Sequence, residues 1–251
     1  MFKIAVSKFI TLGAAFVLSS SGMALAQEGA IKGVVELFTS QSCSSCPPAD
    51  KVLGEIIKRG DVVALAFHVD YWNYLNWKDT FSDAAFTKRQ YDYAASFGST
   101  QVYTPQMIVN GKQSVKAGSP ESVFAAMDQM NKTAGPLSVA VSASVHSGHL
   151  SISAGAGSGE ANLVLVIFEA KESVDILRGE NAGKTVEYHN AVSKISTIGM
   201  WKGQDLKVEL PAKEFMADKG YGCAVLLQRQ TADGTPGEII GAALISGKSN
   251  S

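Results

Sequence analysis

Apolar stretches and an intervening helical pattern predict an α/β arrangement in residues 31–134. Residues 33–40 form a short apolar stretch, and residues 62–69 are too continuously apolar for a half-exposed strand, so both are expected in a covered sheet. Residues 49–59 place apolar side chains at helical spacing between them. This strand–helix–strand order requires a parallel strand pair joined by a right-handed crossover.

The pattern then predicts a second helix, a hairpin and a third helix. Ser82 and Ser119 are residue types that cap helix N-termini, and Pro120 suits a first helical position. Asn110–Gly111 is typical of a tight hairpin turn. The expected elements are a helix over 82–97, strands over 105–109 and 113–116, and a helix over 120–132.

Beyond residue 135 the pattern changes to short stretches that alternate apolar and small polar residues. Turn sequences separate several of these stretches, which is typical of antiparallel sheets. We expect strands over 137–145, 149–153, 163–168, 206–210, 221–228 and 239–245, with a short helix over 211–218. The chain is thus predicted to hold an α/β domain over 31–134 followed by an all-β, sandwich-like domain over 136–247.

The first 26 residues have the pattern of a signal peptide. Lys3 and Lys8 give a basic start, residues 9–18 are apolar, and Ala24 and Ala26 fit the small-residue cleavage rule. The apolar run is too short to span a bilayer, so we expect cleavage after Ala26 and no stable membrane insertion. This pattern favours a periplasmic or secreted protein.

Composition excludes several classes of function. Removal of residues 1–26 takes away two lysines and leaves 20 basic against 23 acidic residues, a formal charge of −3. This charge excludes a strongly basic nucleic-acid-binding protein. A hydrophobic content of 46% excludes a disordered chain. Three cysteines are too few for a secreted disulfide scaffold, and Cys223 lies in an apolar strand pattern that predicts a small buried hydrophobe.

The strongest chemical signal is Cys43-Ser44-Ser45-Cys46, between a predicted strand and a predicted helix. In an oxidising compartment such a pair is either a redox centre or one local structural disulfide, the latter in a non-enzymatic interaction module. In a redox centre, the Cys43 thiolate attacks a disulfide and Cys46 resolves the mixed disulfide. A redox centre of this kind needs no cofactor, and the expected partners of the protein are thiols and disulfides of other proteins or peptides. His68 completes an alternative Cys₂His copper or zinc site.

Two prolines follow the second cysteine directly. Pro48 disfavours the α conformation at Pro47, so we expect the helix to begin at Pro48. Both sulfurs then lie before the first helical turn, where the helix dipole stabilises a thiolate less well. The hydroxyls of Ser44 and Ser45 are alternative hydrogen-bond donors to a thiolate.

The element order, the cysteine pair and Thr104–Pro105 at the start of a strand together resemble the thioredoxin superfamily over residues 31–134. Over nearly the whole mature chain, the sequence is also similar to a secreted bacterial thioredoxin-like family catalogued as domain of unknown function 1223. The motifs that carry this likeness are FTSQSCSSCPPA at 38–49, HVDYW at 68–72, YTPQ at 103–106 and RGEN at 178–181.

The thioredoxin resemblance implies roles for three residues. Pro105 is expected to follow a cis peptide bond and to pack beside the disulfide. The Thr104 backbone is then free to pair with an incoming extended peptide. Glu36 matches a buried strand carboxylate that helps to move a proton from the resolving thiol, unless it points to an exposed edge instead.

The loop after the second strand is rich in aromatic and polar residues. It follows the carboxyl edge of the predicted sheet, where open α/β sheets bind ligands, so we expect Asp70 and Trp72 to contact substrate. The alternative is that the aromatic residues pack over the sheet and that Asp70 caps the loop. Lys88–Arg89 is predicted to be the solvated face of its helix, and residues 178–181 are expected to link the two domains.

Overall fold

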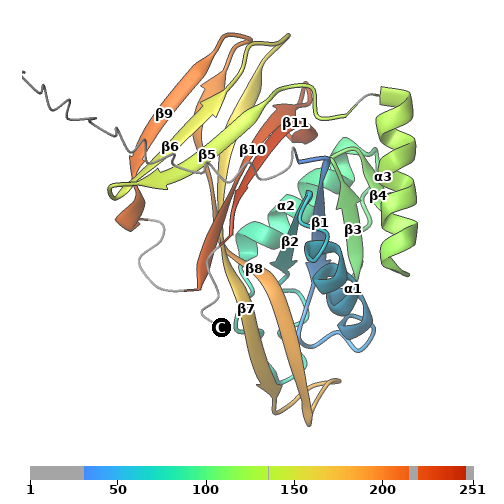
Figure 1. Ribbon diagram of the computed structural model, residues 1–251. Helices are drawn as coiled ribbons and strands as arrows, with labels where there is room; N and C mark the ends of the chain where they lie inside the picture. The colour runs from blue at the N-terminus through green and yellow to red at the C-terminus, as the bar shows by residue number, and fades with distance from the viewer. Residues whose placement is uncertain (1–30, 135, 215–219, 247–251) are drawn as a thin grey trace, which may run out of the picture.

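The fold is seen in a computed structural model, which describes residues 31–134, 136–214 and 220–246 (Figure 1). The predicted signal peptide and its cleavage site lie outside these residues. So does much of the helix predicted over 211–218, of which a 3₁₀ turn at Ala212–Glu214 is described. Within the described ranges, no helix combines the length and apolar character needed to cross a membrane.

The first half of the chain contains its seven elements in the predicted order. Strands β1 and β2 pair in parallel from Gly33–Val62 to Thr39–His68, as the strand–helix–strand order requires. Helix α2 is capped by Asp83, one residue later than predicted, whose carboxylate accepts a hydrogen bond from the Ala85 amide at 2.7 Å. The elements are β1 (Gly33–Thr39), α1 (Pro47–Ile57), β2 (Val62–His68), α2 (Ala84–Ser96), β3 (Gln106–Val109), β4 (Gln113–Val115) and α3 (Pro120–Ala134).

The second half is built of strands, as predicted, but one long strand was not expected from the pattern. This strand, β8, has charged residues such as Glu187 and Lys194 and alternates only over short parts of its length. The strands are β5 (Val141–His146), β6 (His149–Ala154), β7 (Ala161–Ile176), β8 (Lys184–Trp201), β9 (Leu206–Pro211), β10 (Tyr221–Gln230) and β11 (Pro236–Ile245).

Strands from both halves join in one eight-stranded sheet, in the order β11-β10-β7-β8-β2-β1-β3-β4. The halves meet where β8 runs parallel to β2, with Ala191 paired to Ala66. The side-chain amide of Asn190 adds a 2.8 Å hydrogen bond to the Ala64 carbonyl. The position near residue 135 that was predicted as a domain boundary therefore does not separate two sheets. The remaining strands form a second sheet, β5-β6-β9, packed through an apolar core on β7, β10 and β11 (Figure 1).

The two faces of the large sheet carry different helices. Val35 and Leu37 of β1 belong to the buried core under α1 and α3, whereas Val34 and Phe38 belong to the core under α2. Side chains alternate along a strand, so Glu36 faces the α2 side and not α1. This placement decides which residues of β1 lie near the cysteines.

Strands β7 and β8 continue beyond the sheet as a two-stranded ribbon. Strand β7 pairs with β10 as far as Glu169, whereas its pairing with β8 continues to Ile176. The ribbon runs beside α1 (Figure 1), so closely that a Cβ on Gly54 would lie 2.8 Å from the His189 ring. Glycine on this face of α1 therefore lets the ribbon approach, and the loop at its end, residues 177–183, reaches the start of the helix.

Candidate functional site

A disulfide joins Cys43 and Cys46 in the loop between β1 and α1, with 5.4 Å between the two Cα atoms. Ser44 and Ser45 between them are exposed, whereas Cys43 is 1% exposed and Cys46 is fully buried. The Sγ atom of Cys43 lies 3.4 Å from the Ser45 hydroxyl. The exposed surface of the disulfide loop is therefore that of the two serines, and the disulfide itself is covered.

Helix α1 begins at Pro47, one residue earlier than predicted, with Cys46 as its N-cap in an αR conformation. Pro47 and Pro48 have no amide hydrogen. The next two amides, of Ala49 and Asp50, both donate to the Cys46 carbonyl. The first helical turn therefore has no free amide for a thiolate, which leaves hydroxyl donors such as Ser45 to stabilise that charge.

The loop at the end of the β7–β8 ribbon holds the disulfide loop in place. The Asn181 side-chain amide donates 2.9 Å hydrogen bonds to the carbonyls of Gln41 and Cys43. The Glu180 carboxylate accepts a 3.1 Å hydrogen bond from the Ser44 amide. Residues 178–181 were expected to link the two halves, and these bonds make that link at the disulfide itself.

A buried carboxylate connects the disulfide loop to the end of β2. Asp79 is 1% exposed, and its Oδ2 atom accepts hydrogen bonds from the Gln41 amide at 2.7 Å and from His68 Nδ1 at 2.8 Å. Burial alone would lower the pKa of His68, but the Asp79 carboxylate outweighs this effect and raises that pKa. His68 and Asp79 thus form a fully buried hydrogen-bonded pair, in which the carboxylate favours the protonated ring.

The same histidine was the third ligand of the alternative metal site. Its ring packs edge-on against Tyr188, with 4.9 Å between the ring centroids, and its Nδ1 atom is bound to Asp79. Among the described residues, no three His, Cys, Asp or Glu side chains gather in a way that suits a metal ion. The structure therefore does not bring Cys43, Cys46 and His68 together as a ligand set.

Asp50 is a buried acid that the sequence pattern did not single out. It lies one helical turn after Cys46, is 3% exposed, and neither carboxyl oxygen has a hydrogen-bond partner in the described part of the chain. Burial raises the pKa of Asp50 to about 7, and the nearby charge of His68 limits the rise. The Thr39 hydroxyl also lowers this pKa, although its geometry falls short of a hydrogen bond.

Thr104 and Pro105 lie at the carboxyl end of β1. The Thr104–Pro105 peptide bond is cis, as predicted. Gln106, the next residue, pairs with Phe38 near the end of β1, and the disulfide loop begins a few residues beyond Phe38. The indole of Trp72 donates a 2.8 Å hydrogen bond to the Thr104 hydroxyl, so the aromatic loop is tied to this peptide.

Asp70 has a structural hydrogen bond. Its carboxylate accepts a 2.6 Å bond from the Thr87 hydroxyl of α2. Most of the loop's aromatic residues are partly buried, but Tyr74 is 75% exposed and stacks on Trp72. The loop therefore packs over the sheet for most of its length and presents one exposed ring.

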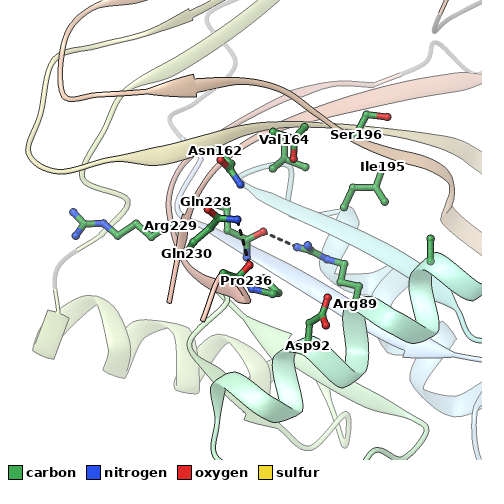
Figure 2. A pocket seen from close by; sticks show the side chains of 13 residues that line it. Arg89, Asp92, Asn162, Val164, Ile195, Ser196, Gln228, Arg229, Gln230 and Pro236 are labelled. Carbon is green, nitrogen blue, oxygen red and sulfur yellow. Dashed lines mark hydrogen bonds between the residues drawn. The ribbon is translucent and has the colours of Figure 1, made fainter. Parts of the chain in front are cut away.

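Glu36 does not join the cysteines. It is fully buried on the α2 side of the sheet, where it accepts two hydrogen bonds from Arg89, at 2.7 and 2.9 Å, and one from the Tyr93 hydroxyl. Arg89 was predicted to be solvated, but its side chain is 10% exposed and pairs with Glu36. Figure 2 shows the pocket of about 230 Å³ beside this network, where Arg89 also donates to Gln228.

Cys223 is fully buried in β10, as its strand pattern predicts, and burial raises the pKa of its thiol to about 11. A protonated thiol in an apolar core is unreactive. Among the described cysteines, Cys43 and Cys46 are thus the pair that could take part in thiol chemistry.

Comparison with known proteins assigns most of the chain to one family. Residues 34–228 match a family described as "Protein of unknown function (DUF1223)". The chain belongs to this family. The match includes the disulfide loop in the first half and residues 178–181 in the second, so both sides of the Asn181 contact lie within it.

Two solved structures have the same overall arrangement. One is the crystal structure of a protein from Agrobacterium tumefaciens, whose sequence is 42% identical to this chain. The TM-score is 0.81, and the match covers 89% of this chain and 97% of that chain. HBP35 of Porphyromonas gingivalis is 14% identical, with a TM-score of 0.62 over 86% of this chain and 75% of that chain, so it is similar in fold alone. No curated protein matches the chain significantly.

Proposed function

We propose that this protein is an exported thiol–disulfide oxidoreductase whose first half is thioredoxin-like. The observation that carries the proposal is the Cys43–Cys46 disulfide at the turn from β1 into α1. Cys43 is the attacking thiol, because the Ser45 hydroxyl lies 3.4 Å from its sulfur and can donate a hydrogen bond to a thiolate there. Cys46, buried at the helix N-cap, is the resolving thiol.

A purely structural role for this disulfide is less well supported. A cross-link that closes a loop of four residues removes little chain entropy, about 2 kcal/mol in the usual loop-closure relation. The same loop is already fixed by backbone bonds from Cys43 to Ser40 and from Cys46 to Cys43, and by the Asn181 amide. A structural cross-link would therefore add little stability to this loop, whereas a reversible disulfide would give it a chemical function.

The proposed substrates are thiols and disulfides of proteins or peptides. Thr104 and Pro105 lie at the same end of the sheet as the disulfide loop, and Trp72 orients the Thr104 hydroxyl. An extended peptide that pairs with the Thr104 backbone would bring its own sulfur to Cys43. Export is proposed from the signal-peptide pattern of residues 1–26. Its test is the intact mass of the exported protein, which should equal that of a chain starting at Gln27.

Single cysteine variants test the proposal. Cys46→Ser should accumulate mixed disulfides with a thiol-containing peptide, because the attacking thiol remains and its resolver is gone. Cys43→Ser should accumulate none, and both variants should lose turnover of a peptide disulfide. Cys223→Ser is the matched control and should behave as wild type. If wild type and the two variants exchange thiols equally slowly, the disulfide is structural and the proposal is wrong.

A further inference from the structure

A group of buried polar atoms without partners lies behind the disulfide. Within the described residues, both carboxyl oxygens of Asp50, the Thr39 hydroxyl, His68 Nε2 and the Tyr188 hydroxyl make no hydrogen bond. Asp50 is 3% exposed and His68 is fully buried. Buried polar groups are normally satisfied, so a group of such atoms in one place indicates a function other than packing.

These side chains come from three strands and one helix and act on one another. The charges of His68 and Asp79 both influence Asp50, and the charge of Asp50 in turn influences His68 and Tyr188. The His68 and Tyr188 rings are in contact, with centroids 4.9 Å apart. They form one buried polar cluster, made of Thr39, Asp50, His68, Asp79 and Tyr188.

Helix geometry places this cluster next to the resolving cysteine. The Asp50 amide donates to the Cys46 carbonyl at 3.1 Å, which is the hydrogen bond of residues one turn apart. Side chains at this spacing lie on the same face of a helix, about 6 Å apart at their Cβ atoms. Cys46 is fully buried, so a proton that it gains or loses must pass through its buried neighbours.

We propose that Asp50 is the proton acceptor and donor for the Cys46 thiol during thiol–disulfide exchange. The inference rests on the proposed function and adds a residue from α1 to it. Glu36, the acid suggested by the sequence, is excluded from this task because its carboxylate is held by Arg89 and Tyr93 on the other face of the sheet.

Asp50 acts in the resolution of the mixed disulfide between Cys43 and the substrate. The Asp50 carboxylate takes the proton of the Cys46 thiol, and the Cys46 thiolate attacks the Cys43 sulfur. The bond between Cys43 and the substrate sulfur breaks as the Cys43–Cys46 bond forms, and the substrate leaves as a thiolate. The two cysteines lose two electrons, and the substrate disulfide has gained them.

The other members of the cluster adjust the acid. Asp79 raises the pKa of His68, and positive charge on His68 favours the carboxylate form of Asp50 against the effect of burial. The Tyr188 hydroxyl stays neutral, because burial and the two aspartates raise its pKa. With the pKa of Asp50 at about 7, both its acid and its base forms are present near neutral pH, as proton transfer in both directions requires.

The test uses the reduced protein, from Gln27 onward, and the symmetric dithiobis-nitrobenzoate disulfide in a stopped-flow instrument. Attack by Cys43 releases one coloured thiolate, and resolution by Cys46 releases the second, so the two steps are seen separately. Asp50→Asn should slow the second release about 100-fold, the lower end of general acid–base effects, and leave the first unchanged. Glu55→Gln, an exposed acid on the same helix, is the control and should change neither.

The pH dependence of the second release gives a second measurement. It would not change if Asp50 had only a structural role. In wild type the second release should accelerate through about pH 7 as Asp50 loses its proton. Asp50→Asn should lose this transition. His68→Gln removes the charge that lowers the pKa of Asp50, so the transition should move to higher pH.

The experiment distinguishes a failure of the proposed oxidoreductase function from a failure of the proposed role of Asp50. If wild type releases no thiolate faster than Cys43→Ser, the proposed function fails. If wild type shows both releases and Asp50→Asn shows the same second release with the same pH dependence, the role of Asp50 is refuted. Should Asp50→Asn not fold, the Asp50 carboxyl can be titrated by NMR in wild type. An Asp50 pKa that is identical in the oxidised and reduced proteins would then refute the coupling to Cys46.

Discussion

Asn181→Ala tests whether the second half of the chain holds the disulfide loop of the first. The substitution removes three hydrogen bonds of a fully buried residue: two of 2.9 Å to the carbonyls of Gln41 and Cys43, and one of 2.8 Å that Lys184 donates to the Asn181 side-chain oxygen. Each such bond contributes about 1 kcal/mol, and each buried carbonyl left without a partner adds a further cost. We expect the free energy of unfolding to fall by about 3 kcal/mol.

The assay is urea unfolding of the oxidised protein, with thermal unfolding as a check. For a chain of this size the expected loss corresponds to a drop in Tm of about 10 °C. Asn131→Ala is the control, because the Asn131 amide makes a single 3.3 Å bond to an exposed carbonyl, and it should cost less than about 1 kcal/mol. A loss for Asn181→Ala no larger than that of the control would show that the contact carries no stability.

Three further perturbations follow from the packing and the charges. Arg89→Ala leaves a buried carboxylate without its cation and should cost about 3–5 kcal/mol in urea unfolding. Gly54→Ala places a Cβ 2.8 Å from the His189 ring and should cost about 1–3 kcal/mol, whereas Gly118→Ala, with open space around it, should cost less. Asp50 holds its proton more tightly in the folded state, so the stability it contributes is present at low pH and is lost between about pH 4 and 7. Asp50→Asn should therefore be more stable than wild type at pH 8, by up to about 4 kcal/mol, and no gain in urea unfolding would contradict the raised pKa.

The local signals of the sequence were sufficient for the order of elements in the first half. The continuous apolar run at residues 62–68 predicts a strand that is covered on both faces. The helical pattern between it and the first strand predicts that the two strands are parallel, and both predictions are confirmed. Cys43 and Cys46 were assigned to the turn between strand and helix for the same reason. The predicted helix start was wrong by one residue. Proline suits the first position of a helix, and at Pro47 this outweighed the effect of the following proline, which disfavours the α conformation.

The parts that were not predicted depend on contacts between distant residues. Strand β8 pairs with β7 along its whole length, and on the ribbon its Glu187 lies on the exposed face while Val186 and Tyr188 are buried on the other. Its single parallel contact with β2 joins segments more than a hundred residues apart, and no local pattern encodes such a contact. The eight-stranded sheet was therefore beyond the reach of pattern analysis.

Two charged residues did carry a signal that the sequence analysis passed over. Arg89 lies between Phe86 and Tyr93 at helical spacing, on the buried face of α2. Asp50 lies similarly three residues before Leu53, on the buried face of α1. A charged residue within an apolar stripe must find a partner or change its pKa, and these two residues illustrate the two outcomes.

The parallel contact of β8 with β2 has a consequence for any attempt to isolate the half of the chain that holds the disulfide. A fragment that ends at residue 134 would leave β2 as an edge strand, with unpaired backbone groups and fully buried apolar side chains newly uncovered. Such flat apolar edges are templates for aggregation. The long C-terminal half thus serves as a protective cover for the sheet, and a shortened protein would be expected to form intermolecular strand pairs along the exposed edge of β2.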